Sequence, residues 1–275
     1  MSAQAHVVSA QQCDDLFATV LAHDAIDLSA PVPESIHLDY SQEQFARCYA
    51  ISRQLWKDGI DRRVFAQILK KLRMQRSLEP TDQLYFKHVR AKFKHLRAAY
   101  AAFDQQHRYP RMFHWLISIM GYLQDALKNK QQRDTHRLAM LLGFLWQSFP
   151  YHFISRKIDH FHLCSTESFR SYVAHEMQFI RNNLDKSGVT SKEFHDIRKV
   201  ISRQVAIYDN LNVLYPSPYH RCVSAYFNTI NGLMGSLHDD LVVKDMNKIQ
   251  NYHADRFPIP DDIRARLVAV TGCYR

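Results

Sequence analysis

Glycine is scarce in this chain of 275 residues, which contains only seven, whereas average usage is roughly 7%. Proline adds nine residues. Because short strands need frequent turn-forming residues, these numbers exclude a sandwich or barrel of many short strands. The sequence also contains no G-x-G-x-x-G and no G-x-x-x-x-G-K-[ST] motif, so the usual glycine-rich loops for dinucleotides and phosphates are missing. We therefore predict long helices.

Cysteine is the second residue type whose pattern excludes structures. The five cysteines are odd in number, widely spaced and form no C-x-x-C pair, which excludes a disulfide framework and a zinc ribbon. No basic segment followed by an apolar run opens the sequence. The longest apolar stretches, 112–123 and 138–146, are too short to span a bilayer. We therefore expect a protein of the reducing cytoplasm with no membrane partner.

Charge is present but unevenly distributed. The formal net charge is +9, yet residues 1–52 hold seven acidic residues and one basic residue. Residues 53–97 hold thirteen basic and four acidic residues. A basic block of this size beside an acidic leader favours a polyanionic partner over a small neutral substrate. A solvated helical surface is the alternative interpretation.

Capping signals and hydrophobic spacing predict an all-α fold. Ser41 and Gln44 form a capping box, Gly59 ends the helix that follows, and Thr81 is the predicted cap of a helix after Pro80. Residues 1–40 are expected to be an acidic segment with a short helix, and 41–275 a single helical domain. The predicted helices are 41–57, 62–76, 81–103, 111–129, 134–148, 165–185, 190–213, 217–246 and 260–270.

An internal repeat organises this domain. A shift of 108 residues aligns residues 85–100 with 193–208, so that Arg90 falls on Arg198, and upstream Arg73 falls on Arg181. A shift of 114 residues aligns Met-Gly-x-Leu-x-Asp at 120–125 with the same pattern at 234–239. The repeat predicts two helical half-units, about 60–150 and 165–250, related by a pseudo-twofold axis around a basic central groove.

Two basic stripes on the repeated helices are the candidate binding residues. The first has spacings of three, four and three residues, and the second contains residues four apart, so each lies along one helix face. Like charges at such spacings repel, and a bound polyanion would turn the repulsion into attraction. Neither stripe contains a carboxylate base, although Asp196 lies near the second, and this favours binding over catalysis. Their members are Lys87, Arg90, Lys94, Arg97, His195, Arg198, Lys199 and Arg203.

At these positions the sequence resembles the CHAD family, the conserved-histidine α-helical domains. The family motif His-x-x-Arg-x-x-x-Lys/Arg-x-x-Arg is matched from Lys87 to Arg97 with lysine in the leading place, and His195-x-x-Arg198 restores the histidine. The family's second signature is similar to the two Met-Gly-x-Leu-x-Asp segments. The resemblance covers about residues 60–250.

The resemblance implies two four-helix bundles around a basic channel that binds inorganic polyphosphate, without a cofactor, a metal or a catalytic centre. It implies that Lys87, Arg90, Lys94, Arg97, His195 and Arg198 bind the ligand, and it extends the expected location to polyphosphate granules in the cytoplasm. Arg73, Arg181, Lys199 and Arg203 are added by the geometry of the repeat. Asp125 and Asp239 are expected either to hold basic side chains in position or to be exposed or capping carboxylates.

A metal-dependent HD phosphohydrolase is the enzymatic alternative. His-Asp pairs occur at His23, His195 and His238, and such enzymes are also all-helical. A second possible metal site is formed by three potential ligands within five residues, His160, His162 and Cys164.

Binding to the phosphate backbone of a nucleic acid is the other alternative. The first stripe helix carries aromatics that could stack on bases, Tyr85, Phe86, Phe93 and Tyr100. Phe86, Phe93 and Tyr100 recur at core spacing and are predicted to be buried, as is the set Trp115, Trp146, Met112, Met120 and Met140. Recognition would then rest on phosphates alone. A further hypothesis is that the acidic leader lies over the basic groove.

Overall fold

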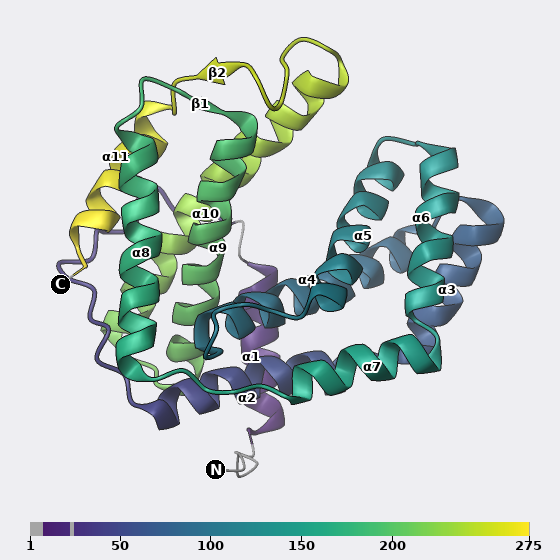
Figure 1. Cartoon of the computed structure of the whole chain (residues 1–275), viewed down its shortest axis with the longest axis horizontal. Helices are drawn as coiled ribbons and strands as arrows, with labels where there is room; N and C mark the ends of the chain where they lie inside the picture. The colour runs from purple at the N-terminus through teal and green to yellow at the C-terminus, as the bar shows by residue number, and fades with distance from the viewer. Residues whose placement is uncertain (1–7, 23–24, 275) are drawn as a thin grey trace.

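The computed structural model describes residues 8–22 and 25–274, and these form an all-α fold (Figure 1). In this part of the chain a two-residue pairing between β1 (Val189–Thr190) and β2 (Arg256–Phe257) is the only sheet. The helices are α1 (Ala10–Leu21), α2 (Gln42–Asp58), α3 (Arg62–Gln75), α4 (Pro80–Phe103), α5 (Arg111–Lys128), α6 (Gln132–Leu145), α7 (Ser148–Asp159), α8 (Thr166–Leu184), α9 (Ser191–Leu214), α10 (Pro218–Met246) and α11 (Asp261–Gly272).

The helix ends follow local chemistry. The capping box of Ser41 and Gln44 is confirmed, and the backbone N–H of Gly59 donates to Leu55 at the other end of α2. The predicted cap at Thr81 is wrong. Pro80 is already the first residue of α4, because its fixed φ suits a first helical position and its missing N–H would have no partner there.

Helix α7 was not predicted. The expected helix 134–148 is instead α6, which ends at Leu145, and α7 begins at Ser148. Proline breaks a helix when it stands in the interior, because it has no backbone N–H. Pro150, however, is the third residue of α7, and the N–H groups of the first turn have no partner within the helix.

Helices α3–α6 and α8–α11 form two groups with the same connectivity. In each group consecutive helices pack together and the first also packs against the fourth. The repeat-related helices α4 and α9 contact each other and join the groups, and Figure 1 shows α8–α11 standing to one side of α3–α7. Repeat-related aromatics have the same environment, since Phe86 and Phe194 are both buried, as are Tyr100 and Tyr208. The twofold axis itself stays a prediction.

The predicted core is confirmed on α4 and corrected on α5 and α6. Phe86, Phe93 and Tyr100 are buried, so these residues are not available for base stacking. Met120 and Trp146 are buried as expected, but Trp115 and Met140 are exposed. Both sit on helices that pack on one side only, and the spacing of apolar residues alone does not show which side is covered.

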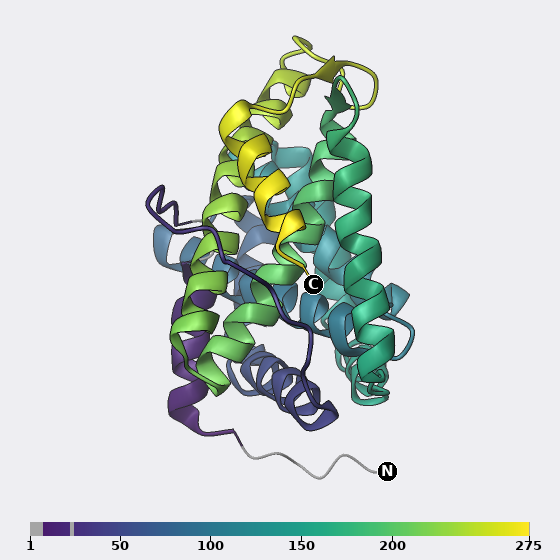
Figure 2. The ribbon, with the colours of Figure 1, turned by 90° about the vertical axis from the view of Figure 1, so that its left-hand side faces the viewer.

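The described part of the acidic leader does not lie over the first stripe. Phe17 of α1 packs edge-on against His88, and the Lys92 ammonium lies 4.1 Å from the Phe17 ring centroid. These α4 residues lie on the face opposite Arg90 and Arg97. Residues 25–40 run along α10 and α11, where Ile36 pairs with Tyr274 (Figure 2).

Two further expectations concern membranes and cysteines. Among the described residues, no helix combines the length and apolar character needed to cross a bilayer. All five cysteines are free thiols, as the absence of a disulfide pattern predicts.

Candidate polyanion-binding site

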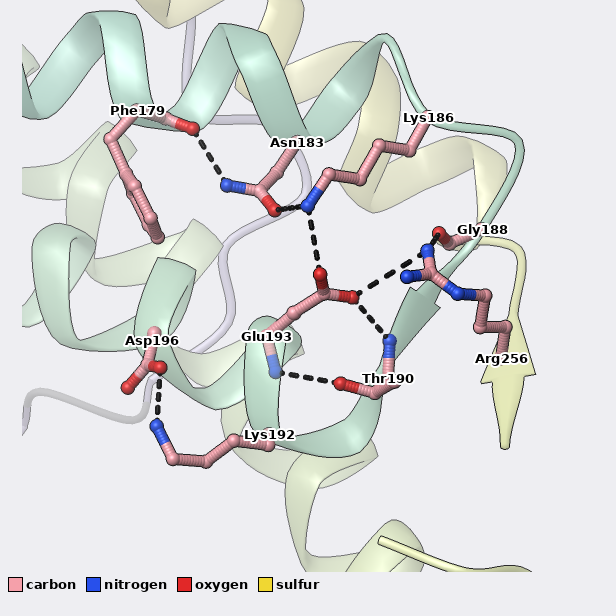
Figure 3. Close-up of polar contacts among 9 residues, drawn as sticks. All are labelled: Phe179, Asn183, Lys186, Gly188, Thr190, Lys192, Glu193, Asp196 and Arg256. Carbon is pink, nitrogen blue, oxygen red and sulfur yellow. Dashed lines mark hydrogen bonds and ion pairs between the residues drawn. The ribbon is translucent and has the colours of Figure 1, made fainter. Parts of the chain in front are cut away.

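The start of α9 is fixed by a network of polar contacts (Figure 3). The Thr190 hydroxyl accepts from the Glu193 backbone N–H at 3.2 Å, and the Glu193 carboxylate accepts from the Thr190 N–H at 2.8 Å. Lys186 donates to Glu193 at 2.8 Å, and Arg256 of β2 lies 3.8 Å from it. Lys186 holds the pKa of Glu193 below its usual value. The first turn of α9, which directly precedes His195, is therefore held by Lys186 from the segment after α8 and by Arg256 from β2.

The rings of His195 on α9 and His238 on α10 are in contact and tilted by 32° relative to each other. Their ring centroids are 4.5 Å apart, and the Tyr252 hydroxyl lies 3.2 Å from Nε2 of His238. Burial lowers the pKa of His195 to about 3, assisted by His238, Lys199 and Arg198. Burial also lowers the pKa of His238 to about 4, with Arg198 as the next cause and Asp239 opposing it. Both imidazoles are therefore neutral at pH 7.

A third histidine, His114 on α5, lies where the two stripes meet. Partial burial lowers its pKa, and Arg97 of α4 and Lys199 of α9 lower it further. The two cations therefore face His114 from different halves of the chain. Lys199 is itself held by Asp196 at 2.9 Å, and Asp196 also accepts from Lys192 at 2.5 Å.

Arg90 of α4 lies directly over Gly121 of α5. A Cβ atom at Gly121 would be 3.2 Å from Nη2 of Arg90, so the absence of a side chain allows the close approach that the glycine predicts. Asp125 lies one turn further along α5. Although this residue as a whole is exposed, local desolvation raises the pKa of its carboxyl, with Arg90 opposing and Asp239 reinforcing the shift.

Asp239 links the two halves. Its carboxylate accepts from Lys128 of α5 at 3.1 Å, and it lies near enough to Asp125 to raise the pKa of that residue. The pair with Lys128 is exposed, so it contributes about 0–1 kcal/mol to stability. Asp125 and Asp239 are both exposed residues whose carboxylates influence each other, and whether they hold the stripe cations in position stays a prediction.

We call the half-buried cations and histidines that these contacts bring together the basic cluster. Lys94 belongs to it by its place on α4 between Arg90 and Arg97. The basic cluster consists of Arg90, Lys94, Arg97, His114, His195, Arg198, Lys199 and His238.

Arg203 adjoins the basic cluster but has a partner. Its Nε donates to Glu176 of α8 at 2.7 Å, and a second nitrogen forms an ion pair with the same carboxylate. The Glu176 side chain is only 6% exposed. Burial would lower the pKa of Arg203, but Glu176 outweighs it and the pKa is raised. Arg203 is therefore a structural residue that joins α8 to α9, not the ligand that the repeat predicts.

This buried pair leads to a stability prediction. Glu176→Gln should lower the free energy of unfolding by about 3 kcal/mol, because a buried guanidinium loses its counter-charge. Chemical denaturation would measure the change. The double variant Glu176→Leu with Arg203→Met should recover much of the loss, since it removes both charges. A loss below about 1 kcal/mol for Glu176→Gln would show that water already solvates Arg203.

Arg73 and Arg181 lie outside the basic cluster. Arg73 is exposed on α3, and its side chain packs by Gly143 of α6. The Arg181 guanidinium donates to the Thr271 carbonyl of α11. Helix α3, which carries Arg73, packs against α6, and α8, which carries Arg181, packs against α11. The two arginines therefore contact α6 and α11 and not the place where α4 meets α9. Lys87 is exposed one turn before Arg90.

The stripes did not reveal two members of the basic cluster. His114 belongs to no motif, and the sequence placed His238 only in a His-Asp pair. The signal that could have found His238 is the repeat, because it lies one residue before Asp239 in the second Met-Gly signature. No such signal exists for His114, which enters the cluster through packing of α5 on α4.

The alternative metal sites are not assembled in the described part of the chain. Residues 8–22 and 25–274 contain no group of three or more His, Cys, Asp or Glu side chains placed to hold a metal ion. Cys164 is buried, whereas His160 and His162 are exposed. The His23-Asp24 pair lies outside the described residues.

No family model, no curated protein and no solved structure matches the chain. The fold and the contacts within the basic cluster therefore carry the functional conclusion.

Proposed function

We propose that the protein binds inorganic polyphosphate through the basic cluster, without catalysis. The observation that carries the proposal is the meeting of two repeat-related helices. Arg97 of α4 and Lys199 of α9 both lower the pKa of His114, and Arg198 and Lys199 add to the effect of burial in lowering the pKa values of His195 and His238. So many like charges in one place destabilise the ligand-free fold. A polyanion would relieve this repulsion.

The chemistry of the cluster suits a chain of phosphates. Arginine presents a planar fork to two oxygens and lysine a point charge, and the cations lie along about two turns of α4, with Arg198 and Lys199 on α9. The resemblance to the CHAD family supports the same ligand, and membership of that family is part of the proposal. A location in the cytoplasm or at polyphosphate granules would follow from it.

The salt dependence of binding tests the proposal. The logarithm of the affinity for long-chain polyphosphate should fall linearly with the logarithm of salt concentration, with a slope on the order of 0.7 per phosphate contacted, if the chain behaves like a single strand. Engagement of the five cations of the cluster would give a slope of about 3.5. Fluorescence anisotropy of labelled polyphosphate measures this slope. A slope near zero, or no binding at low salt, would contradict the proposal.

A further inference from the structure

Two large aromatic side chains stand exposed on α5 beside the basic cluster. Trp115 is 63% exposed and Tyr122 is 64% exposed. They are seven residues apart, so they share one face of the helix and lie about 10 Å apart along its axis. The other two tryptophans, Trp56 and Trp146, are buried. Exposed aromatic side chains grouped on one face are characteristic of an interaction site.

Each exposed aromatic follows a residue that contacts the cluster. Trp115 comes directly after His114, which faces Arg97, and Tyr122 comes directly after Gly121, which lies against Arg90. Since consecutive helical residues differ by about 100° in direction, both rings lie at the edge of the face that meets the cations. Each exposed ring is thus one residue along α5 from a position beside the basic cluster.

Tyr122 also forms one wall of a pocket between α5 and α6. The pocket has a volume of about 370 Å³, and Leu138 and Leu141 supply further apolar wall. Asp125 and Asp134 add carboxylates to it, and Arg137 adds a guanidinium. The carboxylates accept hydrogen bonds from amino groups, and the guanidinium donates to carbonyl and ring-nitrogen acceptors. Apolar walls with both acceptors and a donor suit a planar group such as a nucleobase.

We propose that the basic cluster also binds single-stranded nucleic acid, with bases stacked on Trp115 and Tyr122 while phosphates contact Arg97 and Arg90. This inference rests on the proposed function, because both polymers would use the same cations. The cations of the cluster attract the phosphate backbone of the nucleic acid. Proteins that bind single strands without sequence preference combine such cations with aromatic rings on which the bases stack. In a duplex the bases stay stacked on one another, so only its phosphates would contact the protein, through the cations.

The test compares an unstructured single-stranded oligonucleotide with an abasic oligonucleotide of the same length and with polyphosphate of equal charge. The full chain should bind the oligonucleotide at least about tenfold more tightly than the abasic polymer, because one stacked base already supplies this factor. Fluorescence of Trp115, the exposed one of the three tryptophans, should be quenched by the oligonucleotide and not by the abasic polymer.

Surface variants separate this inference from the proposed function. Trp115→Ala with Tyr122→Ala should reduce oligonucleotide affinity to the abasic level and leave polyphosphate affinity unchanged, whereas Trp115→Phe should retain most of the preference. Phe149→Ala, at an 84% exposed position on α7, is the matched control and should change neither. Equal affinity of the wild-type chain for the two oligonucleotides, with normal polyphosphate binding, would overturn the inference alone. Failure of polyphosphate to bind would contradict the proposed function instead.

Discussion

Replacing Arg90 and Arg198 together by alanine should weaken the binding of long-chain polyphosphate by at least about 100-fold at moderate salt. Each guanidinium forms charge-assisted hydrogen bonds of about 1.5–3 kcal/mol, and a loss of 1.4 kcal/mol is a factor of ten. The two arginines are equivalent in the repeat and lie on α4 and α9. The slope of affinity against salt should also fall, by about 1.4 if each arginine contacts one phosphate.

The matched control removes the same charge elsewhere. Arg73 and Arg181 are also equivalent in the repeat, but they pack by α6 and α11. Arg73→Ala with Arg181→Ala should therefore change affinity less than about threefold, an effect of long-range electrostatics alone. Thermal unfolding would check that both double variants fold. An equal loss of affinity in the two double variants would mean that net charge, and not the basic cluster, determines binding.

Acidification should destabilise the ligand-free protein through His195 and His238. An unfolded histidine has a pKa of about 6.5, whereas the folded values are about 3 and about 4. Above pH 6.5 both states are neutral and the full stability is present. Below pH 6.5 the unfolded state takes up protons that the folded state does not, so the unfolding free energy falls by up to about 1.4 kcal/mol per pH unit for each histidine.

Chemical denaturation at pH 7, 6 and 5 would measure this slope. The variant His195→Asn with His238→Asn should have a slope smaller by about 2–3 kcal/mol per pH unit between pH 6 and pH 5, because neither site can titrate. Saturating polyphosphate should also reduce the slope in the wild-type chain, since bound phosphates offset the repulsion from Arg198 and Lys199. Identical slopes for wild type and variant would show that the histidines protonate freely in the folded protein.

Much of the fold could be predicted because its signals are local. The capping box of Ser41 and Gln44 and the buried face that includes Phe86 and Phe93 both follow from helix geometry. The predictions that were wrong depended on neighbours. Trp115 was predicted to belong to the core, yet it is exposed, and the predicted helix 134–148 ends at Leu145 with a further helix beginning at Ser148.

The candidate site was predicted in part. Arg97 and Lys199 both lower the pKa of His114, and Arg90 lies beside Gly121. Arg203 is instead paired with Glu176. A sequence can show that a cation lies on a helix face, but it cannot show that a carboxylate from another helix already neutralises it.

The sequence by itself determined the all-α class, the repeat and the direction in which each basic side chain leaves its own helix, because helical periodicity and capping act over a few residues. Only the tertiary structure decided which of these faces meet. It joined α4 to α9, brought His114 and His238 to the cations, and left Arg73 and Arg181 outside. The crossing of two helices depends on packing between residues far apart in the chain, and no local pattern records it.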